Sequence, residues 1–296
     1  GLMRELAGHP DPRIRSRLIP PLAQIGAPWA EALLRSLKAE HESERTAGRG
    51  RSGGGAGEAG PLRVEALGPL RIFWGRNELT ARHWRSVKAR DLLVYLAHRG
   101  EPVTKDRIIE DLWPDAFREN SADNFHTTLY RLRRVLEREA ASGIIQYTGK
   151  RCHLVPDFYV LDRRLFEELV IPELNPDPLT EEGARRLERA IALYRGEYLE
   201  DLDYPWAVPD RDYLKRLHLE ASLKLARHHL RRNDYPKAIV LLSRLFEADP
   251  LCEEVCRLLM LAYAGAGDRA AAKKQYQILQ ANLQRELRLE PSEETQ

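Results

Sequence analysis

The sequence predicts a mainly helical protein with a small β component, and three observations predict it. Apolar residues recur at helical spacing through most of residues 87–138 and again beyond residue 180. Short segments that alternate apolar and polar residues stand on either side of the first helical region, at 62–74 and 144–155. In the last third of the chain, two segments repeat at an offset of 34 residues. A chain of 296 residues has room for two or more such domains.

Composition and charge exclude several classes of protein. No apolar run approaches the ~18 residues that would span a membrane, and three cysteines form no disulfide framework, which favours a reducing cytoplasm. Lys and Arg outnumber Asp and Glu by 17 to 12 over residues 62–155, whereas residues 156–296 carry 21 against 26. The basic middle of the chain is therefore the part suited to a polyanion.

The first 61 residues divide into a helical segment and a linker. Apolar residues from Ile14 to Ile25 have helical spacing, and a second apolar face begins at Leu33. This segment, residues 1–45, resembles the last repeat of a HEAT-type array, so we expect the chain to be a piece of a longer protein. Residues 46–61 are mostly Gly and small residues, which predicts a flexible linker with an end-to-end distance of roughly 20 Å.

Residues 62–156 predict a domain of mixed structure. The segments LRVEAL and LRIFW favour two short strands, and NELT is a third candidate. The segment SVKARDLLVYLAHRG predicts a helix that ends at its glycine. Thr104 is the expected N-cap of the next helix, which Pro114 ends. A third helix is expected at 121–138, with Ser121 as its N-cap.

The third helix has one apolar face and one basic face. Its apolar residues share a narrow stripe at 100° per residue: Phe125, Leu129, Leu132 and Leu136. The opposite face therefore carries Thr127, Tyr130, Arg131 and Arg134. After this helix, residues 144–155 predict a hairpin with Lys150 and Arg151 near its tip. Strands, three helices and a terminal hairpin describe a winged helix-turn-helix, whose third helix fits the DNA major groove and whose hairpin, the wing, reaches phosphates.

The segments KARDLL, LWPD, LYRLRRVLE and YTGKRCHLV, in this order, carry a family resemblance. Together they resemble the OmpR/PhoB-type DNA-binding domain and, more closely, the SARP family of antibiotic-regulatory transcriptional activators. The resemblance implies that Thr127, Tyr130, Arg131 and Arg134 lie at groove positions. It also implies that Arg133, Lys150 and Arg151 lie near phosphates. Which bases are read, and whether this winged helix binds protein in place of DNA, both stay open.

Residues 157–296 predict helical repeats. NDYPKAIVLLSRLFEADP and GDRAAAKKQYQILQANLQ align at the 34-residue tetratricopeptide period, and further helices are expected at 182–194 and 210–231. YRGEYLEDLDYPWA, GDRAAA and PSEET resemble the bacterial transcriptional activator domain that follows the winged helix in SARP regulators. The resemblance implies dimerisation, effector sensing or contact with the transcription machinery. The aromatic residues Tyr198, Tyr204 and Trp206 are interpreted as core and capping residues.

No catalytic, cofactor or metal site is predicted. The sequence has no GxxxxGK[ST] phosphate loop and no readable Ser/His/Asp or Cys/His arrangement. Cys252 and Cys256 stand four residues apart on one helix face, which fits buried small residues better than a zinc site.

We therefore expect a cytoplasmic, sequence-specific transcriptional regulator, an activator and not an enzyme. Its expected partner is double-stranded DNA. RNA polymerase, a second copy of the chain and an unidentified effector are further candidates, and no membrane partner is expected. The alternative is a protein-interaction scaffold built from helical repeats, in which the winged helix is a protein-binding module. Groove binding would weaken steeply as salt rises, which separates the two.

Overall fold

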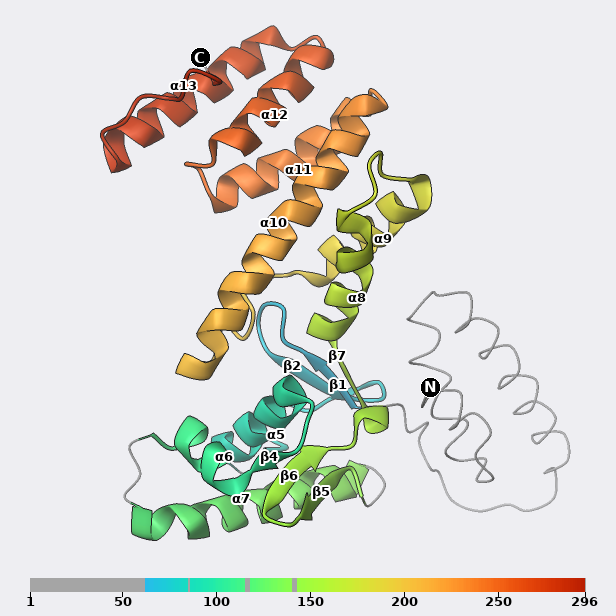
Figure 1. The fold of residues 1–296 in the computed structure, drawn as a ribbon, viewed down its shortest axis with the longest axis vertical. Coiled ribbons are helices and arrows are strands. Elements are labelled where there is room, and N and C mark those ends of the chain that lie inside the picture. The colour runs from blue at the N-terminus through green and yellow to red at the C-terminus, as the bar shows by residue number, and fades with distance from the viewer. Residues whose placement is uncertain (1–61, 85, 115–117, 140–142, 296) are drawn as a thin grey trace, which may run out of the picture. The chain divides into compact units, whose positions relative to one another are not determined.

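The computed structural model describes residues 62–295 except for positions 85, 115–117 and 140–142 (Figure 1). The HEAT-like segment expected at 1–45 and the linker expected at 46–61 lie outside the described residues. The described chain forms two compact units. Unit 1 extends to Leu165 and also includes Tyr198–Val208, and unit 2 comprises Phe166–Glu197 and Pro209–Gln296. The sequence predicts a boundary after residue 156, whereas the first division between the units follows Leu165, inside the helix Asp162–Leu174. Residues Tyr198–Val208 then return to unit 1 and divide unit 2 into two segments.

The described part is mainly helical with a few short strands, as the sequence predicts. Unit 1 contains a four-stranded sheet in the order β3-β2-β1-β7. Its strands are β1 (Leu62–Glu65), β2 (Arg71–Trp74), β3 (Asn77–Glu78) and β7 (Tyr159–Leu161). β1 pairs antiparallel with β2, placing Leu62 opposite Trp74, and parallel with β7, placing Leu62 opposite Tyr159. The sequence interpretation did not include β7.

Three helices of unit 1 follow the first strands: α5 (Val87–Arg99), α6 (Lys105–Leu112) and α7 (Arg118–Glu139). Gly100 ends α5 in the left-handed conformation at φ 67°, which glycine adopts without a steric penalty. Thr104 caps α6 as predicted, since its side chain accepts a hydrogen bond from the Arg107 amide. α7 begins at Arg118, before the predicted start, so Ser121 lies inside the helix and is not its N-cap. Arg and Glu at 118–119 favour helix strongly enough to extend it.

A second sheet in unit 1 has the order β4-β6-β5. β4 is Val103–Thr104, β5 is Ile145–Thr148 and β6 is Arg151–Leu154. β5 and β6 form the predicted hairpin, with Thr148 paired to Arg151 across the two-residue turn Gly149–Lys150. Both turn residues have positive φ, 58° and 62°, which is the backbone that a tight right-twisted hairpin requires.

Unit 1 is completed by a returning segment, Tyr198–Val208, which we call the strap. Leu199 donates its amide hydrogen to the Ala66 carbonyl at 2.8 Å, and Tyr198 forms an antiparallel bridge with Leu67. Tyr198 and Leu199 are fully buried, and a 3₁₀ turn, η2 (Pro205–Ala207), ends the strap. Residues far along the chain therefore supply part of the core of unit 1.

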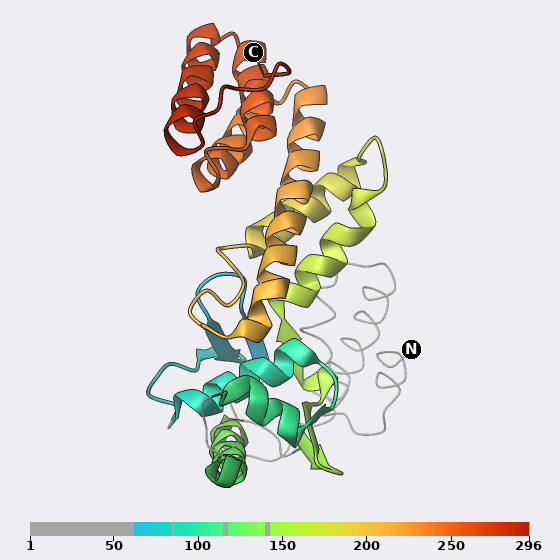
Figure 2. The same cartoon turned by 60° about the vertical axis from the view of Figure 1, so that its left-hand side comes forward.

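Unit 2 is helical. Its elements are the larger part of α8 (Asp162–Leu174), then α9 (Glu181–Leu193), α10 (Val208–Arg231, except its first residue), α11 (Tyr235–Ala248), α12 (Glu253–Gly265) and α13 (Arg269–Glu286). α12 packs between α11 and α13, and the three helices lie side by side in Figures 1 and 2. Their core includes Ala238, Leu242, Leu259 and Leu279. α11 and α13 begin directly after Asp234 and Asp268, the pair that the 34-residue offset aligns.

No helix in the described ranges has both the length and the apolar composition needed to cross a bilayer.

Candidate functional site

α7 shows the two faces that its sequence predicts. Phe125, Leu129, Leu132 and Leu136 are buried. On the opposite face, Thr127, Tyr130, Arg131 and Arg134 are exposed, and Tyr130 is 61% exposed despite its large ring. The apolar face explains the position of the helix, because burying each large side chain stabilises unit 1 by about 1.5–3 kcal/mol. The exposed face has no such structural explanation.

Unit 1 holds the buried face of α7 against α5 and the hairpin. α5 and α7 pack against each other, and the Phe125 ring lies 5.5 Å from the ring of Tyr147 on β5. Val135 is also buried. The outward direction of the basic face is therefore set by contacts on the other side of the helix.

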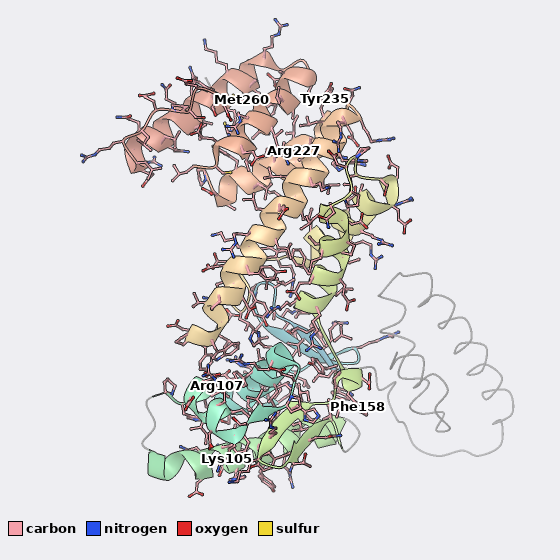
Figure 3. The ribbon with its side chains drawn as sticks, viewed as in Figure 1. Lys105, Arg107, Phe158, Arg227, Tyr235 and Met260 are labelled. Carbon is pink, nitrogen blue, oxygen red and sulfur yellow. The ribbon has the colours of Figure 1, made fainter. Side chains whose placement is uncertain are left out.

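The hairpin tip is tied to the start of α6. The Lys105 amide donates to the Lys150 carbonyl at 2.9 Å, and Thr104 pairs with Arg151 between β4 and β6. Figure 3 labels Lys105 in this part of unit 1. Lys150 and Arg151 both have exposed side chains. The cations of the hairpin are thus presented on a framework that backbone hydrogen bonds fix.

The cations of α7 and the hairpin tip have no anionic neighbours among the side chains that the structure describes. No hydrogen bond or ion pair joins Arg131, Arg134, Lys150 or Arg151 to those side chains. The Arg134 guanidinium lies 6.0 Å from the centre of the Tyr130 ring, at the outer limit of a cation–π contact. We call these four cations the open cations.

The arginine of α6, in contrast, forms hydrogen bonds with a carboxylate. Arg107 donates from Nε to Asp111 Oδ2 at 3.0 Å, and Arg99 of α5 donates to the same oxygen at 2.9 Å. The Tyr95 hydroxyl donates to it as well, at 2.6 Å, and together with burial this hydrogen bond raises the pKa of Tyr95 to about 12. Asp111 therefore neutralises cations of α5 and α6 that the chain would otherwise present to solvent.

Arg133 stands apart from the other predicted residues of α7. It is only half-exposed, and its charge acts on the buried thiol of Cys152 in β6. Burial is the stronger influence and raises the pKa of that thiol to about 12, so Cys152 stays protonated. Arg133 thus lies toward the hairpin, away from the centre of the basic face.

Two exposed side chains beside the basic face were not among the predicted residues. Asn124 and His126 are exposed on α7, and the His126 ring lies 5.8 Å from the Tyr147 ring. The sequence could have indicated both residues, because they lie 100° to either side of Phe125 on the helical wheel, at the margins of the apolar stripe. Both side chains have polar groups that can form hydrogen bonds with a base edge or a phosphate.

The strap contacts α5 through a chain of partly buried hydrogen bonds. The Tyr204 hydroxyl donates to Asp91 Oδ2 at 2.6 Å, and Lys88 Nζ donates to the Tyr204 hydroxyl at 2.9 Å and to the Leu112 carbonyl at 2.6 Å. Burial is the main reason that the pKa of Tyr204 is raised. Trp206 packs edge-on against Tyr95, with ring centres 5.2 Å apart. Of the three aromatic residues interpreted as core and capping residues, Tyr198 is fully buried, whereas Tyr204 and Trp206 are partly exposed. Their contacts with α5 support the helix against which α7 packs.

Of the two cysteines that stand four residues apart, Cys256 is buried and Cys252 is partly exposed. Burial raises the pKa of the Cys256 thiol to about 11. Across the described ranges, no three His, Cys, Asp or Glu side chains come together as metal ligands.

Comparisons with known proteins find similarity to bacterial regulatory proteins. Residues 161–296 match the family model of the bacterial transcriptional activator domain. The chain is 25% identical over 239 residues to Regulatory protein AfsR of Streptomyces griseus, a match that covers 80% of this chain and 24% of that protein. It is 26% identical over 270 residues to Transcriptional regulator RedD of Streptomyces coelicolor, covering 84% of this chain and 76% of RedD. The chain thus spans about a quarter of the length of AfsR.

A solved structure shares the fold. Mycobacterium tuberculosis EmbR, in complex with a low-affinity phosphopeptide, superposes with a TM-score of 0.66 at 22% identity. The match covers 79% of this chain and 62% of the EmbR chain.

Proposed function

We propose that this chain is the DNA-binding and helical-repeat part of a SARP-type bacterial transcriptional regulator. The match of residues 161–296 to the bacterial transcriptional activator domain supports the class, as do the regulatory proteins AfsR and RedD among its relatives. The observation that carries the DNA-binding step is the set of open cations on α7 and the hairpin, which lack anionic neighbours among the described side chains.

In this proposal α5, α6, α7 and the β5–β6 hairpin act as a winged helix. α7 enters the major groove, where Arg131 and Arg134 meet guanine O6 and N7 or a phosphate through two parallel N–H bonds. The Thr127 hydroxyl bonds to a base or the backbone, and Tyr130 lies beside the same groove. The packing of α7 against α5 favours this role, because the helix backbone need not be ordered on binding.

In this proposal the hairpin positions the domain on the DNA and does not read the base sequence. Lys150 and Arg151 at its tip contact phosphates on either side of the groove, and Arg133 adds a further contact at the edge of α7. Each phosphate neutralised releases counterions, so the logarithm of the binding constant falls by about 0.9 per contact for each tenfold rise in salt. Phosphate contacts carry no sequence information, and base contacts from α7 supply it.

Unit 2 supplies the regulatory part of the proposed function. Its helices set the geometry of a dimer, sense an effector or contact RNA polymerase. A dimer of such units would read tandem half-sites about one helical turn apart, roughly 34–36 Å between centres. We propose an activator and not an enzyme, because residues 161–296 match the bacterial transcriptional activator domain and the relatives AfsR and RedD are regulators.

The experiment that tests this proposal is selection of bound duplexes from a random DNA pool by the full chain. A recovered tandem motif, bound with an affinity that falls steeply as salt rises from 50 to 200 mM, is the expected result. A pool without enrichment would contradict sequence-specific binding.

The second candidate function is a protein-interaction scaffold. Three exposed apolar side chains of unit 2 favour it: Val240, Leu261 and Leu289, each more than half exposed. Such a scaffold would leave the random pool unenriched and would bind its partner with little dependence on salt, because apolar burial releases no counterions.

A further inference from the structure

Unit 2 contains a groove that none of the comparisons assigns. Its walls come from α9, α10 and α11, and its volume is about 420 Å³, within the range of pockets that hold small organic ligands. The middle of the groove is aliphatic, with Ile191, Leu225, Val240 and Leu241 as its lining. Val240 is 56% exposed, so its side chain is accessible from the solvent side of the groove.

One end of the groove carries a cation without an anionic neighbour. Arg244 lines the groove, is exposed, and forms no hydrogen bond or ion pair with the described side chains. Lys237, the other cation of the lining, lies 3.3 Å from the Asp234 carboxylate and is therefore already neutralised. The two cations stand seven residues apart on α11, roughly 10 Å along the helix axis.

The other end carries a buried imidazole without a hydrogen bond. The side chain of His229 is only 9% exposed, yet it lines the groove. Its Nε2 lies 3.8 Å from Glu188 Oε1 and its Nδ1 lies 3.9 Å from Asp234 Oδ2, both beyond hydrogen-bond length. Burial lowers the pKa of His229, so the ring is neutral at pH 7, with one nitrogen to donate and one to accept.

The positions of these residues along α9, α10 and α11 give their order along the groove. Glu188 and Ile191 lie on successive turns of α9, and His229 and Leu225 lie on successive turns of α10. Because Glu188 approaches His229, the polar end is at this level and the aliphatic lining follows it. Arg244 lies beyond Val240 and Leu241 on α11, at the far end. The groove therefore has an anionic and hydrogen-bonding end at Glu188 and His229, an aliphatic middle and a cationic end at Arg244.

We infer that this groove binds a small amphipathic organic acid. The carboxylate meets Arg244, the apolar body covers the aliphatic lining, and a polar group, where the ligand has one, bonds to His229. An amine in place of the carboxylate would meet the Arg244 charge at close range and be repelled. The inference concerns unit 2 alone, so its test needs no DNA and its failure would leave the DNA-binding proposal intact.

The test uses three eight-carbon probes that differ only in the head group: octanoate, 1-octanol and octylamine. Each is titrated into the full chain by isothermal calorimetry at pH 7. We expect octanoate to bind roughly fivefold more tightly than octanol, the scale of a partly solvated ion pair. Any binding of octylamine should use Glu188, at the opposite end of the groove, and should not depend on Arg244. Equal binding of octanol and octanoate, or no binding of octanoate, would overturn the inference.

Two variants and a matched control locate the site. Arg244→Gln should abolish the preference for octanoate over octanol, and Val240→Asp should weaken both probes without unfolding the chain, because Val240 is exposed. Arg285→Gln removes a cation from α13, outside the groove, and should change neither affinity. Octanoate binding that survives Arg244→Gln unchanged would remove Arg244 from the site and overturn the assignment.

Discussion

α6 and α7 are neighbouring helices of one unit, and both carry arginines, yet the two helices use them differently. Arg107 of α6 donates to Asp111, which also accepts from Arg99. Arg131 and Arg134 of α7 reach none of the described carboxylates. The difference shows that a count of basic residues does not locate an anion-binding surface. The anion-binding surface is located by the cations that the fold leaves without counter-charges, because only these cations gain a new ion pair when an anion binds.

The largest expected effect comes from removing the open cations of α7. We expect the double variant Arg131→Ala/Arg134→Ala to lose about 2–6 kcal/mol of specific DNA affinity, or about 1–3 kcal/mol for each base contact. Fluorescence anisotropy with the selected duplex measures this loss. The control Arg99→Ala/Arg107→Ala removes the same charge from the paired set, and its affinity is measured in protein that circular dichroism shows to be folded, because Asp111 is left without its cations. Equal losses in the two double variants would break the comparison between the helices.

The second test releases the paired arginines without removing them. Asp111→Asn removes the charge that holds Arg99 and Arg107 while leaving an amide of the same shape. We expect the free energy of unfolding of unit 1 to fall by about 3 kcal/mol, since a buried acceptor of three hydrogen bonds loses its charge. Denaturant titration followed by Trp fluorescence is suited to unit 1, which holds Trp74, Trp84, Trp113 and Trp206.

The control for this second test is Glu110→Gln, which affects a mostly exposed carboxylate 3.8 Å from Arg107. It should change stability by less than about 0.5 kcal/mol. DNA affinity should not fall in Asp111→Asn when the protein is folded, because the open cations are unchanged. A fall in affinity as large as that of the α7 double variant would show that pairing does not separate the two helices.

The third test concerns the imidazole of His218, a group that folding keeps neutral, in contrast to the arginines, which stay charged. His218 of unit 2 stacks on Tyr194 with ring centres 4.1 Å apart, and burial lowers its pKa to about 4. Because the unfolded chain takes up this proton first, stability is lost as the pH falls from about 6.5 toward 4. Between pH 7 and pH 5 the loss is about 2 kcal/mol.

His218→Phe keeps a ring on Tyr194 and removes the proton. Denaturant unfolding followed by circular dichroism at both pH values should give a smaller loss for this variant. His229, whose pKa is also lowered, accounts for part of the dependence that is left. An unchanged pH dependence would show that His218 is not held neutral.

The smallest expected effect is at the hairpin turn. Lys150 adopts φ 62°, which costs a non-glycine residue about 1 kcal/mol. We expect Lys150→Gly to raise the stability of unit 1 by about 0.5–1 kcal/mol and to reduce the salt slope of DNA binding by about one unit. Lys150→Ala is the matched control, because it removes the charge and keeps the strain. A salt slope that neither variant changes would remove Lys150 from the open cations that contact phosphate.

Local pattern predicted much of this arrangement. The faces of α7 followed from four apolar residues at 3.6-residue spacing, and the hairpin from a two-residue turn flanked by β-forming residues. The pair Arg107–Asp111 was also readable, since residues four apart meet on a helix. Arg131 has Val135 at the same offset, so its lack of a local partner was visible in the sequence as well.

Contacts between distant residues could not be predicted in this way. β7 has only three residues, too few for a period, and its partner β1 lies about a hundred residues earlier. Arg99 meets Asp111 only because α5 and α6 pack together. The roles of the proposed contact residues in DNA binding stay predictions, since exposure alone does not identify a ligand.

The strap sets an order of events during synthesis. Most of unit 1 leaves the ribosome with the first 165 residues, yet Tyr198 and Leu199, both fully buried in it, emerge only after α8 and α9. Domains fold as their chain becomes available, so the nascent N-terminal part must wait with an unfilled core until residue 208 appears. Gene fragments that end between residues 165 and 198 would lack the strap and leave that core incomplete.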